Sequence, residues 1–177
     1  GFAALKTDGS VVTWWDSSLW WWDSSSVSVD LVNVESIYST ERAFAALKTD
    51  GAVVTWWVSS FWWDSSSVSW ELVNVETIYY TPYSYAALKA DGTVVTWWHS
   101  SYWWDSSSVS VDLENVESIY SNAWSFAAVK TDGTVVTWWD TTKWWDSSSV
   151  SWDLEKVERI YSNDYSYAAV KTDGSVV

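Results

Sequence analysis

The chain contains no cysteine, so disulfide bonds and thiolate metal sites are excluded. Basic residues are scarce as well: 9 Lys and Arg face 23 Asp and Glu, and the formal net charge is −14. A charge of this sign repels phosphate backbones, which argues against nucleic-acid binding. No apolar run reaches the length of a membrane span, so we expect no membrane insertion. The acidic balance favours solubility and cationic partners.

Methionine is also absent and only six glycines are present, whereas tryptophan occurs 20 times. Apart from Gly1, every glycine follows an aspartate. The sequence begins in the middle of a recurring pattern and has no initiating Met. We therefore expect it to be a fragment of a longer array.

One phrase, Phe-Ala-Ala-Leu-Lys-Thr-Asp-Gly in its first copy, recurs along the chain with small changes. The period is 42 residues once and then 41 residues three times, from copies that begin at Phe2, Phe44, Tyr85, Phe126 and Tyr167. Internal repeats of this length are typical of solenoids and propellers. Residues 1–177 therefore form a single repeat array, with four repeats plus a partial one.

The composition of each repeat predicts strands. Residues 44–48 and 52–57 are short runs of strand-forming residues on either side of an Asp-Gly pair. Such a pair predicts a β-hairpin, because glycine accepts the positive φ that the turn needs. Residues 34–39 predict a further strand, and Val68 a short edge strand within a polar connection. No segment shows sustained helical periodicity, so the expected fold class is all-β.

Both faces of the predicted hairpin are apolar. If the turn pairs Leu47 with Val53, these two residues share one face with Ala45, while Phe44 and Trp56 share the other. A sheet that is apolar on both faces must be covered on both, and tandem repeats achieve this by stacking. We therefore expect repeats of about 41 residues that form β-propeller blades, with an open β-solenoid as the alternative.

Three segments carry a resemblance to a known family: residues 43–48, the Asp50-Gly51 pair and residues 53–56. Together with the preceding strand they resemble the repeats of the regulator-of-chromosome-condensation family. The resemblance implies a β-propeller with four-stranded blades. Members of that family serve as guanine-nucleotide exchange factors, ultraviolet photoreceptors and interaction scaffolds. The Arg-rich surroundings of the photoreceptor tryptophans have no counterpart here, since Arg42 and Arg159 are the only arginines.

The repeats depart from the family pattern at its glycines. Where the family has Trp-Gly-Asp, this chain has Trp14-Trp15-Asp16, and equivalent substitutions recur at Trp57, Trp98 and Trp139. A bulky side chain is strained where glycine serves a positive φ or a close backbone approach. One hypothesis is that UGA codons for glycine were read as tryptophan, and the alternative is a genuine Trp-rich variant. The codons at these positions distinguish the two.

Catalytic and metal chemistry has little support. His99 is the only histidine, so a Ser-His-Asp arrangement cannot recur in four copies, and the serines after Asp64 have no activating base beside them. Turn capping explains the once-per-repeat carboxylates better than calcium binding does, for Asp23, Asp64, Asp105 and Asp146. The aspartates of the Asp-Gly pairs belong to the hairpin turns. We therefore expect no enzyme activity, no metal and no cofactor.

Variation among otherwise near-identical copies is the stronger functional signal. Two sets of positions differ from copy to copy and form the candidate binding surface: Glu41, Arg42, Pro82, Tyr83, Ala123, Trp124, Asp164 and Tyr165 in the first, with His99 and Tyr102 in the second. Equivalent positions in a repeat array lie along one face, and loops carry function on a repeating scaffold. The alternative is neutral drift at exposed sites. The recognition hypothesis predicts that these loops cluster in space.

The function that these observations favour is a non-catalytic protein-interaction or structural scaffold, part of a large secreted or surface protein. Its partner would be another protein or a glycan, and exposed repeat ends would allow self-association. A carbohydrate-binding propeller is the first alternative, because Trp faces stack on sugar rings. A Trp-based ultraviolet sensor is the second, by family analogy.

Overall fold

The computed structural model describes residues 1–14, 24, 27–57, 68–98, 109–139 and 150–177. Among these residues the chain consists of strands and turns with short 3-10 helices and no α-helix, which confirms the all-β class. The elements in chain order are β1 (Phe2–Leu5), β2 (Val11–Trp14), β3 (Val34–Ser39), β4 (Ala43–Lys48), β5 (Val53–Trp57), β6 (Val75–Tyr80), β7 (Ser84–Lys89), β8 (Val94–Trp98), η2 (Ser110–Asp112), β9 (Val116–Ser121), β10 (Ser125–Lys130), β11 (Val135–Trp139), η3 (Ser151–Asp153), β12 (Val157–Asn163) and β13 (Ser166–Lys171).

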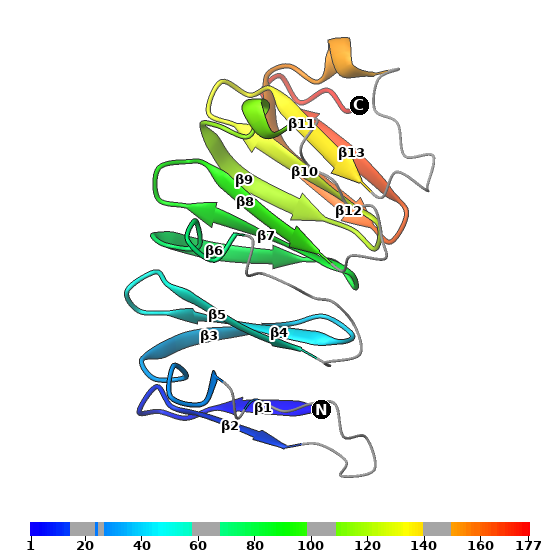
Figure 1. Cartoon of the computed structure of the whole chain (residues 1–177). Helices are drawn as coiled ribbons and strands as arrows, with labels where there is room; N and C mark the ends of the chain where they lie inside the picture. Colours follow the sequence, from blue (N-terminus) through cyan, green and yellow to red (C-terminus); the bar gives the residue numbers. More distant parts are fainter. Residues whose placement is uncertain (15–23, 25–26, 58–67, 99–108, 140–149) are drawn as a thin grey trace.

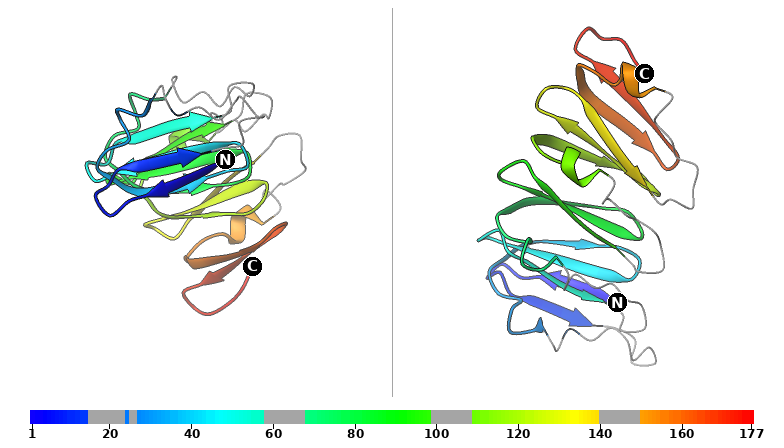
Figure 2. Two further views of the ribbon diagram at one scale, coloured as in Figure 1. Left: turned by 90° about the horizontal axis from the view of Figure 1, so that it is seen from below. Right: turned by 45° about the horizontal axis from the view of Figure 1, so that its top comes forward.

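The strands form five small antiparallel sheets, one after another along the chain. Strands β3-β4-β5, β6-β7-β8 and β9-β10-β11 make three-stranded sheets, and β1-β2 and β12-β13 make two-stranded ones. Figure 1 shows the sheets stacked face to face, and both Figure 1 and Figure 2 place the two termini at opposite ends of the stack. The first strand of each sheet contacts the first strand of the next, so β3, β6, β9 and β12 run together as inner strands. The repeats are thus blades of the β-propeller type.

Two expectations about the blade need comment. The four-stranded blade implied by the family resemblance is matched by three strands in the described residues, and residues 58–67, between two sheets, lie outside them. The edge strand expected at Val68 is wrong. Val68 begins a tight turn in which its carbonyl accepts a hydrogen bond from the Glu71 N–H at 2.8 Å.

The hairpin register is the one that the Asp-Gly turn predicts. Leu47 lies opposite Val53 and Phe44 lies opposite Trp56, and the later copies repeat this pairing. The two rings of the Phe44–Trp56 pair stack with centroids 5.1 Å apart. The inner strand pairs with the middle strand through one register shift, which leaves Glu35 as a bulged residue between Val34 and Ser36.

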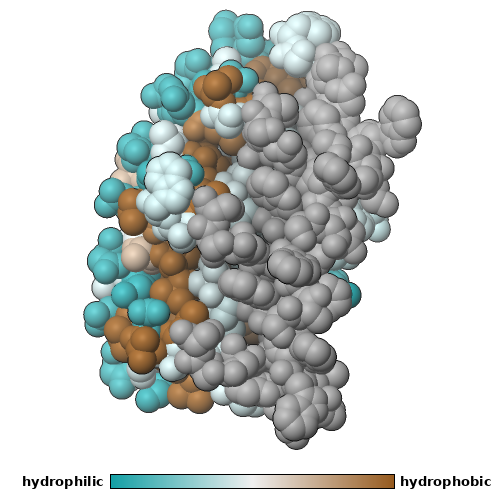
Figure 3. Space-filling model, viewed as in Figure 1, coloured by the Kyte–Doolittle hydropathy of each residue, from teal (hydrophilic) through white to brown (hydrophobic). Residues whose placement is uncertain are grey.

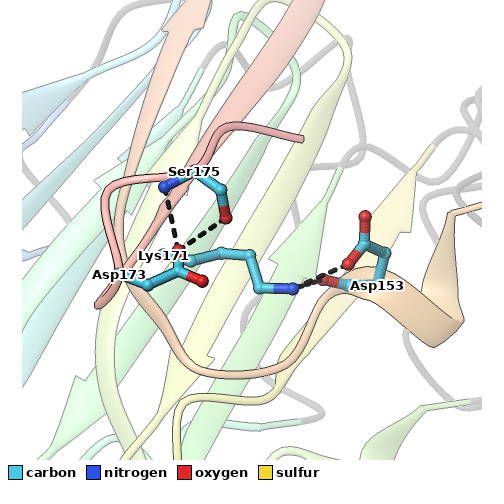
Figure 4. A network of polar contacts seen from close by, with 4 residues as sticks. All are labelled: Asp153, Lys171, Asp173 and Ser175. Atoms are coloured by element: carbon cyan, nitrogen blue, oxygen red, sulfur yellow. Dashed lines mark hydrogen bonds and ion pairs between the residues drawn. The ribbon is translucent and has the colours of Figure 1, made fainter.

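Asp-Gly turns close the hairpins through the aspartate side chain. In the last copy, the Asp173 carboxylate accepts hydrogen bonds from the Ser175 backbone N–H at 2.9 Å and the Ser175 hydroxyl at 2.6 Å (Figure 4). Figure 4 also shows Lys171 of the preceding strand, whose ammonium group lies 2.6 Å from the Asp153 carboxylate of η3. The structural role expected for these aspartates therefore has a direct geometric basis.

The hydrophobic core lies between the sheets. Ala45 and Leu47 on one face of the second sheet are buried against Ile78, Tyr85 and Trp97 of the third, and equivalent clusters follow in the later repeats. In Figure 3 hydrophobic residues form a band along the stack, with hydrophilic residues at the edge of the hairpin turns. Each interior sheet is thus covered on one face by the preceding repeat and on the other by the following one, as its two apolar faces require.

A second set of contacts, between a hairpin turn and the loop that precedes the next sheet, joins each repeat to the one before it. Asn74 has φ +57°, a left-handed conformation that is uncommon for any residue except glycine. Its Cα lies 3.0 Å from the position that a Cβ on Gly51 would occupy, so any larger residue there would crowd the Asn74 backbone. The Val75 N–H donates to the Gly51 carbonyl at 2.9 Å, and the Asn74 carbonyl accepts from the Ala90 N–H at 2.9 Å. The same arrangement recurs at Asn33, Asn115 and Lys156.

The two end hairpins keep an apolar face exposed. Phe2 and Trp14 stack like their interior counterparts, with centroids 5.5 Å apart, but are 64% and 49% exposed. At the other end Val176 is 64% exposed, although its equivalents in the interior repeats are covered by a following sheet. Complementary faces that pair inside the stack are therefore open at its ends.

Candidate functional site

The turns that join each inner strand to the middle strand share one design. The first residue of the turn places a side-chain oxygen under the N–H groups that follow it. The Thr81 hydroxyl accepts from the N–H groups of Tyr83 and Ser84 at 3.1 and 3.0 Å. The side-chain oxygen Oδ1 of Asn122 accepts hydrogen bonds from the backbone N–H groups of Trp124 and Ser125, both at 2.8 Å. Thr and Asn therefore accept the same two backbone hydrogen bonds at this position, as expected for such turns.

These four turns, residues 40–42, 81–83, 122–124 and 163–165, line one groove of about 640 Å³. Each repeat contributes the end of its inner strand and the first two residues of its turn. The described residues of the lining are Ser39, Thr40, Glu41, Ile78, Tyr79, Tyr80, Thr81, Pro82, Ser121, Asn122, Ala123, Ser162, Asn163 and Asp164. The groove therefore crosses four consecutive repeats at one edge of the stack.

The structure brings half of the first candidate set together in this groove. Glu41, Pro82, Ala123 and Asp164 line it, one from each repeat. Their neighbours in the same turns lie outside its lining: Arg42, Tyr83, Trp124 and Tyr165. His99 and Tyr102 lie outside the described residues, as do the carboxylates Asp23, Asp64, Asp105 and Asp146. That the variable residues bind a partner remains a prediction.

Two of the turn residues that lie outside the groove lining pack within the protein. The rings of Tyr83 and Trp124 stack with centroids 5.6 Å apart and an interplanar angle of 28°. Both also pack against the hydrophobic cluster around Phe126 and Trp138. Part of the aromatic surface that the sequence offers for recognition is therefore used inside the protein. Tyr165, at the equivalent turn position, is exposed.

Tyr85 anchors the first groove turn and was missed by sequence reasoning. Its buried hydroxyl donates to the Ala43 carbonyl at 2.8 Å and accepts from the Thr40 N–H at 3.2 Å. Burial of the ring is the main cause that raises the pKa of Tyr85 far above its ordinary value. Tyr167 makes the equivalent bond to the Ser125 carbonyl, at 2.7 Å. The signal in the sequence was the alternation of Phe and Tyr at the start of each copy.

The charged groups of the groove are carboxylates. Glu41 lies in the first of the four turns and Asp164 in the last, and the described residues of the lining include no Lys, Arg or His. Hydroxyl groups of Ser, Thr and Tyr supply most of the remaining polar surface. Among them, burial raises the pKa of Tyr79, whose hydroxyl also forms a hydrogen bond with the Ile119 backbone. The groove is thus negative at its two ends and rich in neutral hydrogen-bonding groups between them.

One polar atom at the groove lacks a hydrogen-bond partner among the described residues. Asn122 is 8% exposed, and its Nδ2 is buried with no hydrogen-bond partner among the described residues. The orientation of the amide is fixed, because Oδ1 already accepts from two backbone N–H groups and the Ser125 hydroxyl. A buried donor without an acceptor costs about 1–3 kcal/mol, which is rarely retained without a reason.

Other places in the described residues offer less. A cavity of about 320 Å³ lies at the opposite edge, around the Gly133 turn, and mixes Lys130 and Lys156 with Glu117, Asp132 and Glu158. Within the described ranges no group of three or more His, Cys, Asp and Glu residues could hold a metal ion. No helix in that part of the chain is long and apolar enough to cross a membrane.

No protein-family model matches the sequence, and the search of curated proteins found no relative. Solved structures do match. Human WBSCR16 has a TM-score of 0.52 at 16% identity, over 81% of this chain and 46% of that one. The CRINKLY WD40 ectodomain of the Arabidopsis thaliana receptor kinase ACR4 has a TM-score of 0.46 at 15% identity, over 81% and 49%. The ectodomain of the Physcomitrella patens receptor kinase CR4 has a TM-score of 0.47 at 12% identity, over 80% and 37%.

At these identities the likeness concerns the fold alone, and it agrees with blades of the β-propeller type. The chain spans about half, or less, of the length of the structures it resembles. The resemblance to the regulator-of-chromosome-condensation repeats stays a likeness of sequence pattern, since no family model matches.

Proposed function

We propose that this chain is a non-catalytic interaction scaffold that holds a partner in the groove formed by its four inner turns. One observation carries the proposal: positions that vary among near-identical repeats, Glu41, Pro82, Ala123 and Asp164, line one continuous groove. A repeating scaffold with variable residues along one face is the usual arrangement of a recognition surface.

The chemistry of the groove suits binding. Among the described residues its lining offers hydroxyls, amides and two carboxylates, and includes no imidazole, amine or thiol for acid–base or nucleophilic steps. The Tyr80 ring, 46% exposed, adds a flat apolar surface on which a ligand can pack. An exposed aromatic ring among hydroxyls also suits a sugar, so a glycan is the second candidate partner.

The test is a selection followed by a blocking mutation. The chain is screened against a displayed peptide library and a glycan array, and the ligands obtained are measured again on Ala123→Trp, which fills the groove. Ala90→Trp is the matched control, because it adds the same side chain at an exposed turn on the opposite edge. We expect Ala123→Trp to abolish binding and Ala90→Trp to leave it unchanged. Equal binding to both variants would overturn the proposal.

The end hairpins support a second type of contact, between copies of the chain. Phe2 and Trp14 present the face that interior repeats bury against the preceding sheet, and Val170 and Val176 belong to the face that interior repeats bury against the following one. The C-terminal hairpin of one copy therefore has the surface that fits the N-terminal hairpin of another. Such head-to-tail pairing leaves each pair with two further open ends.

A further inference from the structure

We infer that the groove takes an extended polypeptide segment with a basic side chain near each end. This inference rests on the proposed function and adds the chemistry of the partner. It depends on three features of the groove: the placement of its charges, its length, and the unpaired amide of Asn122.

Charge comes first. Glu41 and Asp164 are three repeats apart, and no other charged side chain belongs to the lining in the part of the chain that the structure describes. Both residues are exposed, so their carboxylates are hydrated and are available to a partner at little desolvation cost. The net charge of −14 adds a background potential that draws cations toward the protein and repels anions. A ligand with two separated positive groups matches this pattern, whereas one with negative groups does not.

The length of the groove sets the length of the segment. The groove runs along the ends of four neighbouring inner strands, so a ligand that reaches both Glu41 and Asp164 must cross all four turns. An extended chain rises by about 3.3 Å per residue, so a segment of several residues is needed to connect the two carboxylates.

The unpaired amide of Asn122 distinguishes among the classes of ligand that carry positive charge. Its Nδ2 needs an acceptor, and the Ser121 hydroxyl in the same lining offers a further donor. A polyamine brings positive charge but no acceptor, and a neutral glycan brings acceptors but no positive charge. An extended peptide supplies a carbonyl at every residue and places basic side chains at chosen positions. It is the ligand that satisfies both the carboxylates and the amide.

The test uses a fluorescein-labelled eight-residue peptide, Arg-Thr-Ser-Thr-Thr-Ser-Thr-Arg, and the same peptide with Gln at both ends. Fluorescence anisotropy measures binding to the full chain and to Glu41→Gln, Asp164→Asn and the double variant. The matched control is Glu117→Gln with Glu158→Gln, which removes the same charge at the opposite edge. We expect the Arg-ended peptide to bind more tightly. Each single variant should weaken it about two- to fivefold, and the double variant by about the product.

Three results would overturn the inference: equal binding of the Arg- and Gln-ended peptides, equal weakening by the control variant, or tighter binding of spermine than of the peptide. These outcomes are separate from failure of the proposed function. Ligands from the selection that lack basic residues but are lost in Ala123→Trp would keep the groove as the site and reject the basic segment alone. Ligands unaffected by Ala123→Trp would reject both.

Discussion

Asn122 and Thr81 hold the same position in successive turns, yet they leave the protein in different states. Each supplies the oxygen that two backbone N–H groups need. Thr81 is also satisfied through its hydroxyl, which lies 2.8 Å from that of Ser84. Asn122 has an amide nitrogen in excess, and it is buried without a partner in the described structure. The groove turn of the third repeat is therefore less stable than that of the second, because it buries a donor without an acceptor.

Asn122→Thr should accordingly stabilise the protein and weaken its ligand. The turn acceptor is kept and the unpaired donor removed, so we expect the free energy of unfolding to rise by about 1 kcal/mol in urea titrations. Binding of the Arg-ended peptide should fall. Asn163→Thr is the control, because Asn163 is exposed and its amide can reach solvent. A loss of stability in Asn122→Thr would mean that the amide nitrogen is not an uncompensated cost.

The Asp-Gly turns provide a second comparison within the chain. The Asp91 carboxylate accepts from both the backbone N–H and the hydroxyl of Thr93, and the hydroxyl bond is the main cause that lowers the pKa of Asp91. Asp50 has only the backbone bond, because residue 52 is Ala. We expect Ala52→Thr to raise the melting temperature by about 1–2 °C at neutral pH.

The pH dependence of that gain follows from the sign of the shift. A carboxyl with a lowered folded-state pKa stabilises the fold above its unfolded value of about 4, and this contribution disappears as the pH falls through the folded value. The advantage of Ala52→Thr over wild type should therefore vanish in acid. Thr93→Ala should show the mirror image, a loss at neutral pH that shrinks in acid. A pH-independent difference in melting temperature would rule out this origin.

At the scale of the element, each glycine of an Asp-Gly turn serves two purposes that can be separated. Gly133 and Gly174 have φ of +80° and +84°, so an alanine is strained equally at both. A Cβ on Gly133 would lie 2.9 Å from the Lys156 Cα of the next repeat, whereas nothing lies within 4 Å of one on Gly174. We expect Gly174→Ala to cost about 1 kcal/mol and Gly133→Ala at least 1 kcal/mol more, measured by urea unfolding. Equal losses would mean that the contact between repeats adjusts freely.

Tyr85 links the packing of one sheet to the position of a groove turn in another. Tyr85→Phe removes the hydroxyl that bonds to both Thr40 and Ala43. We expect a loss of about 1 kcal/mol in the free energy of unfolding. The Glu41 contribution to peptide binding should also shrink, so that Glu41→Gln has less effect in the Tyr85→Phe background. Tyr165→Phe is the control, and an unchanged Glu41 effect would make Tyr85 a residue of stability alone.

The sequence predicts those parts of the blade that depend on local chemistry. An Asp-Gly turn between two short strands determines the register, so the Leu47–Val53 pair and the two apolar faces are predictable. Contacts between distant residues are less accessible. Asn33, Asn74 and Asn115 look like loop residues until each Cα is seen against the glycine of the preceding repeat, and Lys156 hides the pattern in the fourth copy.

The candidate site divides in the same way. Variation among copies predicted that the variable turns lie close together, because the repeat places equivalent residues along one edge. It did not distinguish Glu41 and Asp164, which line the groove, from Tyr83 and Trp124, which stack on each other. The change from Thr to Asn at the head of the turn looks like drift, although both residues supply the same acceptor. The unpaired nitrogen of Asn122 depends on its burial, which no local pattern encodes.

At the scale of the whole molecule, the groove and the end faces should respond to salt in opposite directions. A cationic peptide is attracted to the protein, and screening weakens that attraction as the Debye length falls to about 8 Å at 0.15 M salt. Two copies of the chain, each of charge −14, repel one another, and the same screening favours their head-to-tail contact through apolar faces.

We therefore expect the mean mass in sedimentation experiments to rise with protein concentration, and to rise further as salt is added, while peptide affinity falls. Trp14→Lys should abolish the association because it places a charge on the N-terminal face, and Trp70→Lys, at an exposed turn away from both ends, should not. Peptide binding should survive both changes, since neither residue lines the groove. A mass that is independent of concentration and salt would show that the open faces do not pair, because a non-closing contact between identical copies must grow with both.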